Sequence, residues 1–358
     1  MGTLLTITIA LLVFGFLIFI HEFGHYITAR IFKVSIKTFS IGMGPKLISY
    51  ESKKTGIEYS ISMLPIGGYV AMVGEDEDSD DPNAFNKKPA WQRFIITAAG
   101  ATVNIVVGFF AMIILVCFLK IGTTYYGGAA TDEEIINSYE GYEVDLSVRS
   151  SDSGLIAGDQ IISVNGKSVK IYDELSYQIM RYGYEPVDLV VLRNGEKVEI
   201  SDVQFPTVEQ QGQTFGIIDF YMPQYVKKNP LNIFSLAFRK SALVMRMCWE
   251  SIIDLITGRY TVEAVSGPVG ISSAIGNAAK AGILSLLNIT VIISMNLGFM
   301  NLLPIPALDG GRLLTILIEM ISRKKIPAHI EGMINTIGLA LLLVLSVVIM
   351  FKDIISLF

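Results

Sequence analysis

Two histidines and a glutamate stand at the end of an apolar run, in the stretch "FLIFIHEFGHYITAR" of residues 16–30. His21 and His25 are four residues apart, so on a helix both imidazoles lie on one face and can reach the same metal ion. Glu22 stands beside them, where its carboxylate can take a proton from a water molecule at the metal. The spacing predicts a zinc site that carries its own general base.

Two simpler explanations compete with a metal site. The five-residue pattern also arises by chance, and a helix that leaves a membrane often ends in polar residues. In this chain, however, the three ionisable groups would lie at or just below a membrane interface, where burying them without partners is costly. The metal interpretation is therefore favoured.

A catalytic zinc ion needs a third protein ligand and an open position for water. The chain has three histidines in all, so only one lies outside the motif. The candidates for the third ligand are His329, Asp309, Glu319 and Glu331.

Asp309 is the favoured third ligand because of its position in "NLLPIPALDGG". Pro304 and Pro306 interrupt the helix there, and Gly310 and Gly311 permit unusual backbone, as expected where a side chain must be aimed back into a helix bundle. In the alternative interpretation, Asp309 only caps the N-terminus of the following helix.

The composition of the chain predicts that it is a membrane protein. The 358 residues are 51% hydrophobic with a mean hydropathy of +0.52, well above that of a soluble protein. The formal charge of −5 says little about partners, and no basic stripe suggests nucleic acid. Four segments are each near the ~20 residues that cross a bilayer. They are Thr3–Ile20, Phe94–Leu119, Ile283–Leu303 and Met333–Phe351.

The first segment resembles a signal peptide only superficially, since it has no positive start or small-residue cleavage site and runs directly into His21. We expect it to be a retained helix within residues 1–32. The other spans are expected within residues 94–120, 283–303 and 333–352.

The distribution of Lys and Arg predicts the orientation. Nine of these residues lie between the first two spans, four lie between the last two, and none precedes the first span. The positive-inside rule then puts both termini and the region between spans two and three outside the cell. It also puts His21 and Asp309 at the same inner face.

Residues 33–93 are rich in β-branched residues and glycines, which predicts short strands and hairpins associated with the inner membrane face. The acidic run of residues 75–82 is interpreted as a solvated loop. Residues 304–332 are expected to form the inner connection that carries Asp309.

Residues 127–208 have the composition of a soluble domain, and "GLIAGDQIISVNGKSV" at 154–169 resembles the core of a bacterial PDZ domain. The pattern predicts a strand at Gln160–Val164, a turn at Asn165 and Gly166, and a helix at Asp173–Arg181. PDZ domains accept an extended peptide as an added strand. Both peptide capture and a purely steric or docking role remain open.

Residues 209–282 follow this domain and contain an amphipathic stretch at 232–258, which we expect to be a surface helix and not a fifth span. Cys117 and Cys248 are interpreted as packing residues, because they are expected at different depths.

Taken together, "HEFGH", "SIGMGPKL", "LPIGGYVAMVGE", "SGPVGI" and "NLLPIPALDGG" resemble the site-2 protease family of intramembrane zinc metalloproteases, in particular the bacterial regulator-of-sigma-E protease type. The resemblance covers nearly the whole chain. It implies a polytopic α-helical membrane protein with four transmembrane helices, a membrane-associated β-hairpin region and an extracytoplasmic α+β PDZ domain.

The resemblance also implies roles for individual residues. His21, His25 and Asp309 would bind Zn²⁺, Glu22 would be the general base, and Asn301 would hold the substrate or the developing oxyanion. The remaining residues are implied to bind an unwound substrate segment; they are Gly42, Gly44, Gly67, Gly68, Pro304 and Pro306.

The implied function is hydrolysis of peptide bonds within single-span membrane proteins, namely anti-sigma factors and remnant signal peptides, in regulated intramembrane proteolysis. The implied location is a bacterial inner or plasma membrane, with the active site near the cytoplasmic face. The implied partners are those substrates, membrane lipid and a peptide ligand of the PDZ domain.

The sequence departs from the family pattern at two points. Ala101 stands where the family often has proline, and one PDZ core is visible where the enterobacterial type has two. Two other functions were weighed. A non-catalytic scaffold would have no need of Glu22, and a cation transporter would show paired broken helices in repeated halves.

Overall fold

The computed structural model describes residues 3–355 except 76, 78, 211, 260–264 and 327. The chain forms two compact units. The first contains Met1–Leu115, Val244–Thr257 and Val265–Phe358, and the second contains Val116–Leu243 and Gly258–Ala264. Every residue predicted to bind metal or substrate belongs to the first unit.

In the described part of the chain, four helices are long and apolar enough to cross a membrane, which confirms the four predicted spans. They are α1 (Thr3–Ile31), α2 (Ala90–Phe118), α7 (Ile283–Leu302) and α9 (Ala328–Ile355). α1 continues for three turns beyond the apolar run that ends at Ile20, so the histidine motif lies within the helix, as predicted. α2 runs unbroken through Ala101, so the missing proline has no visible effect on the helix.

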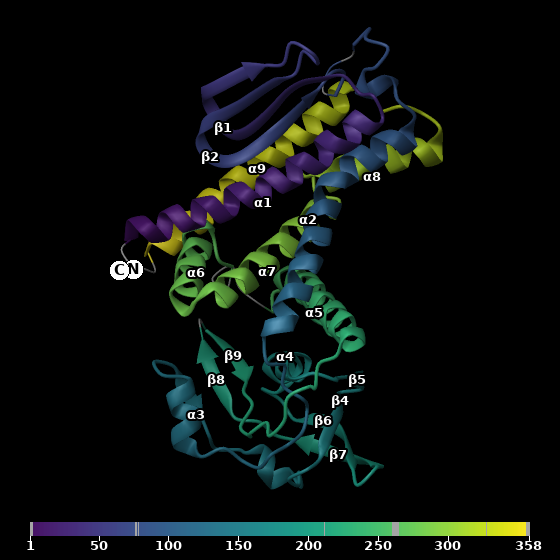
Figure 1. The fold of residues 1–358 in the computed structure, drawn as a ribbon. Coiled ribbons are helices and arrows are strands. Elements are labelled where there is room, and N and C mark those ends of the chain that lie inside the picture. Colours follow the sequence, from purple (N-terminus) through teal and green to yellow (C-terminus); the bar gives the residue numbers. More distant parts are fainter. Residues whose placement is uncertain are drawn as a thin grey trace. The chain divides into compact units, whose positions relative to one another are not determined.

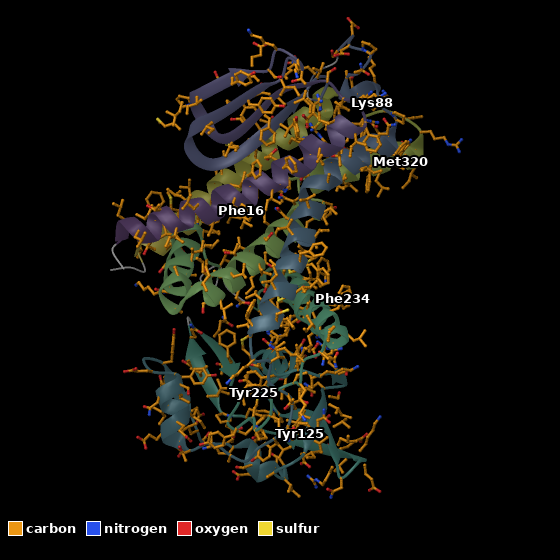
Figure 2. All side chains as sticks on the ribbon, in the orientation of Figure 1. Phe16, Lys88, Tyr125, Tyr225, Phe234 and Met320 are labelled. Carbon is orange, nitrogen blue, oxygen red and sulfur yellow. The ribbon has the colours of Figure 1, made fainter. Side chains whose placement is uncertain are left out.

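These helices expose large apolar side chains. Phe16 on α1 is 53% exposed, and many residues on the outer face of α9 are similarly exposed (Figure 2). Because soluble proteins rarely expose apolar surface on this scale, lipid is the solvent that matches it. The protein is therefore a membrane protein.

In place of the predicted short strands, this region forms one long antiparallel hairpin of β1 (Ile36–Glu51) and β2 (Glu58–Met72), which lies against α1 (Figure 1). Both strands bend, so that Phe39 of β1 pairs with Val70 and also with Tyr59. Positive φ angles at Gly42, Gly44 and Gly67 occur at the bends. The end of β2 is left as an edge of the sheet.

The hairpin is held on α1 by a buried apolar cluster that also includes α2 and α8 residues. Its buried members are Ala29, Val34, Ile36, Phe39, Ile57, Val70, Met72, Phe85, Ile96 and Ile316. The position of the β2 edge beside α1 is thus fixed by side-chain packing.

The rest of the first unit consists of shorter helices and the second half of α5. The short helix η1 (Phe85–Lys87) precedes α2, and α6 (Pro268–Ala281) precedes α7. Asp353 of α9 accepts hydrogen bonds from Gly267 N and Gly270 N at the start of α6. A Cβ on Gly267 would lie 2.9 Å from Asp353 Oδ2, so this glycine of "SGPVGI" lets the carboxylate approach. The predicted inner connection at 304–332 contains a further helix, α8 (Asp309–Ser322).

The helix α5 (Pro230–Thr257) corresponds to the predicted amphipathic stretch and is not among the four candidate spans. Phe234 on α5 is 58% exposed, and Met320 on α8 is also exposed (Figure 2). Cys117 and Cys248 are both free; Cys248 is partly buried, as a packing residue would be, whereas Cys117 is exposed, so its interpretation as a packing residue is wrong.

The second unit contains two antiparallel sheets around a helix. One sheet has the order β5-β4-β6-β7, and the other has the order β3-β8-β9. The strands are β3 (Glu143–Asp145), β4 (Gln160–Val164), β5 (Lys167–Ser168), β6 (Val187–Arg193), β7 (Glu196–Val203), β8 (Thr207–Gln210) and β9 (Gln213–Gly216). The helices are α3 (Asp132–Ser138), η2 (Ser150–Ser153) and α4 (Tyr172–Tyr182).

The predicted strand, turn and helix of this unit are confirmed. β4 has the predicted bounds, and Asn165 and Gly166 have φ angles of 46° and 74°, which a two-residue hairpin turn requires. α4 extends the predicted helix by one residue at each end.

Candidate active site

The metal-binding residues predicted from sequence meet at one point. The two ring nitrogens, His21 Nε2 and His25 Nε2, are 3.2 Å apart, and Asp309 Oδ2 lies 3.1 and 3.2 Å from them. Both histidines are buried, and only 24% of the Asp309 side chain is exposed. Within the described residues, these three form the one group of histidine, cysteine and acidic side chains close enough to hold a metal ion.

The triangle of ligand atoms has the size that zinc requires. Zinc bonds of about 2.0–2.1 Å in a tetrahedron place neighbouring ligands about 3.3 Å apart. The observed separations of 3.1–3.2 Å are close to this, and Asp309 Oδ2 is a buried carboxylate oxygen without a conventional hydrogen-bond partner. The three residues therefore fit a zinc ion, and the open side leaves room for a fourth ligand.

The charge state of Asp309 also suits a ligand. Burial alone would raise the pKa of this carboxyl group, but its contacts with the two imidazoles and their charges outweigh burial and hold the pKa below its usual range. The carboxylate is therefore ionised, as metal binding requires.

Close contact between α1 and α2 sets the position of His25. A Cβ atom built on Gly24 would lie 2.6 Å from Ala99 O, and one built on Gly100 would lie 2.3 Å from His25 Nε2. Only glycines allow the helices to approach this closely. At this distance His25 Nδ1 lies 2.8 Å from Ile96 O, so its proton can be donated to that carbonyl while Nε2 faces the metal position.

The break between α7 and α8 sets the position of Asp309. Residues 303–308 are not helical, as the two prolines predicted. A Cβ on Gly310 would lie 1.8 Å from Leu303 O, so the glycine lets the chain fold back on itself. Ala307 has a φ of 71°, a strained value for alanine, and its N–H is 3.4 Å from Asn335 Oδ1 of α9.

Asp309 is the first residue of α8. The N-cap residue is Leu308, and no side chain makes a capping hydrogen bond there. The alternative interpretation of Asp309 as a helix cap is therefore wrong. Glu319 and Glu331 are not ligands either, because they pair with Arg93 and Arg312 respectively. The side chain of His329 lies outside the described part of the structure.

Glu22 and the ligands open into a cavity of about 610 Å³. Glu22 accepts a hydrogen bond from the backbone N–H of Val70, at the edge of β2. The cavity is lined by His21, Glu22, His25, Thr97, Asp309 and Arg312, by residues 69–72, 75 and 307–308, and by residues 332, 335, 336 and 339. The metal position, the acid–base residue and a strand edge thus face one space.

The predicted substrate-binding residues are spread around this space. Gly68 lies next to Glu22, where a Cβ would be 3.1 Å from Glu22 Cγ. Gly42, Gly44 and Gly67 lie at bends of the hairpin, and they are not among the residues that line the cavity.

The residues predicted at the end of α7 are not among those that line the cavity. Asn301 is half-buried in the last turn of α7 and is not among the lining residues. Pro304 is exposed, whereas Pro306 packs against Gly338 of α9, where a Cβ would lie 2.4 Å from Pro306 Cβ.

Several residues of the site were not predicted from the sequence. The acidic run was predicted to be a solvated loop, but its first residue, Glu75, lines the cavity, pairs with Arg312 and accepts a hydrogen bond from Met72 N. Asp76 and Asp78 lie outside the described residues. Asn104, on α2, has its amide beside His21. An asparagine inside an apolar span was a signal that could have identified it.

Two histidines and an adjacent glutamate on a membrane-length helix, together with a carboxylate at the start of α8, define a metallopeptidase site in a membrane protein. The sequence profile of peptidase family M50 matches residues 9–345. The chain belongs to this family, the site-2 protease family, and is a zinc metalloprotease.

Relatives match along nearly their full length. A protein of Clostridium acetobutylicum, whose name places it among the zinc metalloproteases, is 36% identical over 351 residues, covering 98% of this chain and 97% of that protein. The zinc metalloprotease RasP of Geobacillus kaustophilus is 29% identical over 425 residues, with 98% of each chain covered. The regulator of sigma-W protease RasP of Bacillus subtilis is 26% identical over 434 residues, with 99% of each covered.

Proposed function

We propose that this chain hydrolyses peptide bonds within the transmembrane segments of single-span membrane proteins. The observation that carries the proposal is the position of the site. His21, Glu22 and His25 lie within α1, inside the candidate span Leu4–Ile31, and meet Asp309 in the cavity beside them. A peptide bond cleaved here must itself lie at membrane depth.

His21, His25 and Asp309 hold the zinc ion in this proposal. When bound, zinc lowers the pKa of a water molecule toward ~7 and polarises the scissile carbonyl. Glu22 takes the proton from the attacking water and passes it to the leaving amine. Its place in the same cavity, one residue from His21, suits this transfer.

The β2 edge is proposed to hold the substrate. A transmembrane helix hides its peptide bonds and must be locally extended before hydrolysis, and an extended chain needs new hydrogen-bond partners at this depth. Residues 69–72 line the cavity on the side away from β1, so a substrate strand added there would face Glu22 and the metal position.

The substrate class is proposed from the relatives and the site together. The Bacillus subtilis relative is named a regulator of sigma-W protease, which supports an anti-sigma factor as substrate in regulated intramembrane proteolysis. Remnant signal peptides are also proposed as substrates, because each consists of one short apolar helix in the membrane. Asn301 remains a proposed contact for the substrate or oxyanion. So do the glycines and prolines predicted to bind substrate.

The second unit is proposed to be a PDZ domain outside the cell. The β4 strand, the Asn165–Gly166 turn, α4 and the β6–β7 hairpin follow the PDZ order. The strand beside α4 is β9, where a Cβ on Gly216 would lie 2.5 Å from Ile179 O. Because this contact leaves no room for a peptide between the two backbones at that point, a steric or docking role is favoured over peptide capture.

Cleavage by a Glu22→Gln variant tests the proposed chemistry. The variant keeps the shape of the side chain but has no carboxylate to accept a proton, so we expect it to retain zinc and to lose about 10²–10⁴-fold in cleavage rate. The assay uses the purified full chain, a model single-span substrate in lipid nanodiscs, and separate metal analysis.

The companion variant Asp309→Ala distinguishes the ligand role from the proton-transfer role. It should lose zinc and activity together. Undiminished cleavage by Glu22→Gln would refute the proposed mechanism, and a wild-type chain that cuts only water-soluble peptides would refute the intramembrane substrate.

A further inference from the structure

His21 has a neighbour on α2 whose role is unassigned. The Asn104 side chain is completely buried, and its amide Nδ2 lies 3.4 Å from His21 Nδ1. The other amide atom, Oδ1, has no hydrogen-bond partner among the described residues. An asparagine buried in a membrane span at the back of a zinc ligand requires an explanation.

The zinc site determines which amide atom faces the ring. If Nδ2 donates to Nδ1, the proton of neutral His21 must sit on Nε2, which then has no lone pair for a metal. Because Nε2 is the atom that faces His25 and Asp309, metal binding requires the proton on Nδ1. The oxygen and nitrogen of an amide have almost the same shape, so the amide can be turned to present Oδ1 as the acceptor.

The second histidine already shows this arrangement. His25 Nδ1 lies 2.8 Å from Ile96 O, and Ile96 is also on α2. The backbone carbonyl of Ile96 can only accept a hydrogen bond, so it selects the His25 tautomer that leaves Nε2 free. α2 thus lies behind both histidines, with a main-chain acceptor for one and a side-chain amide for the other.

Asn104 is itself held in place by α7. Its backbone carbonyl accepts a hydrogen bond from Ser294 Oγ at 2.9 Å, and a Cβ on Gly298 would lie 3.3 Å from Asn104 Cβ. The backbone and the Cβ atom of Asn104 are therefore held against α7.

We propose that Asn104 is a positioning residue for the zinc site, which accepts the Nδ1 proton of His21 through Oδ1 and fixes the tautomer and direction of the ring. The proposal rests on the zinc-binding role of His21. Partners of this kind typically contribute about 10–100-fold to metal affinity.

The test compares Asn104→Leu with Asn104→Asp. Leucine has the same branched outline but no acceptor, so we expect zinc affinity to fall by about 10–100-fold. Aspartate keeps an acceptor oxygen at the same place, so its affinity should stay within about threefold of wild type. Affinity is measured on the full chain in nanodiscs by competition with a zinc chelator.

The control variant is Thr102→Val, which removes an exposed side-chain hydrogen bond to Ala98 O on the same helix without touching His21 or Asn104 and should leave zinc affinity unchanged. A second measurement uses ¹⁵N-labelled histidine, since the chain has only three histidines. The ring-nitrogen shifts of zinc-loaded wild type should show His21 protonated at Nδ1.

Three results would overturn the proposal. They are wild-type affinity in Asn104→Leu, equal losses in the leucine and aspartate variants, and an equal loss in Thr102→Val. If wild-type protein binds no zinc at all, or if His21→Ala has no effect on zinc affinity, the zinc site itself fails, and this outcome is distinct from the other three.

Discussion

At the scale of single residues, glycines contribute as much to the site as the ligands do. Gly24 lies inside the histidine motif because α1 touches the α2 backbone there, and Gly310 follows Asp309 because the chain folds back on Leu303. In each case a single Cβ atom would overlap backbone, which cannot move aside as a flexible side chain can. The glycines of the motifs are therefore packing requirements of the zinc site.

Gly100→Ala tests this at the ligand itself. The new Cβ would lie 2.3 Å from His25 Nε2 and would displace the ring from the metal position. We therefore expect zinc affinity to fall by at least about 100-fold, which exceeds the typical effect of removing a hydrogen-bond partner of a metal ligand. The measurement is zinc content and chelator competition on purified protein.

Gly108→Ala is the matched control on the same helix, because its Cβ would meet the flexible side chain of Met295 instead. Zinc content should be normal in this variant. Normal zinc binding by Gly100→Ala would show that α2 does not approach His25 as described.

At the scale of elements, the site depends on the edge of β2 and the break between α7 and α8. The edge brings N–H and C=O groups to the cavity, and the break turns Asp309 toward α1. A strand edge left open in a soluble protein invites unwanted pairing. Here the open edge faces the proposed catalytic residues, and we propose that it pairs with an extended substrate.

Val70→Pro tests the edge. The N–H of Val70 points to Glu22 on the free side of β2, so proline removes a donor from that side without removing a ladder hydrogen bond. We expect zinc binding to be retained and cleavage of a transmembrane substrate to fall by roughly tenfold, the equivalent of about one hydrogen bond of 1.4 kcal/mol.

Zinc analysis and cleavage are measured on the same preparation of Val70→Pro. A substrate already extended by helix-breaking residues should be affected just as strongly, because it needs the same edge. Unchanged cleavage of both substrates would exclude pairing at Val70.

At the scale of the whole molecule, the chain combines a membrane-embedded unit with a second unit inserted between two of its spans. α2 and α5 both run from one unit into the other. The positive-inside rule predicts the hairpin of β1 and β2 on the cytoplasmic side and the second unit outside.

Cysteine labelling in intact cells tests this orientation. Thr55→Cys, between β1 and β2, should react with a membrane-impermeant maleimide only after the cells are opened, whereas Glu196→Cys on β7 should react in intact cells. Both positions are exposed, and both variants are made after Cys117 and Cys248 are replaced by serine. The reverse pattern would invert the proposed topology.

The sequence alone determined those features that depend on local order along the chain. Four apolar runs specified the spans, the four-residue spacing placed His21 and His25 on one helix face, and the Asn-Gly turn located β4 and α4. Each of these follows from the period of a helix, the thickness of a bilayer or the backbone freedom of a turn.

Only the tertiary structure decided how distant segments meet. It showed Asp309 beside two histidines more than 280 residues away, excluded Glu319 and Glu331 by pairing them with arginines, and brought Asn104 behind His21. No local pattern records where two helices cross, because the crossing is set by the packing of small residues on both. The chemistry could be predicted from the residue types, but the site exists because Gly24 and Gly100 let α1 and α2 come together.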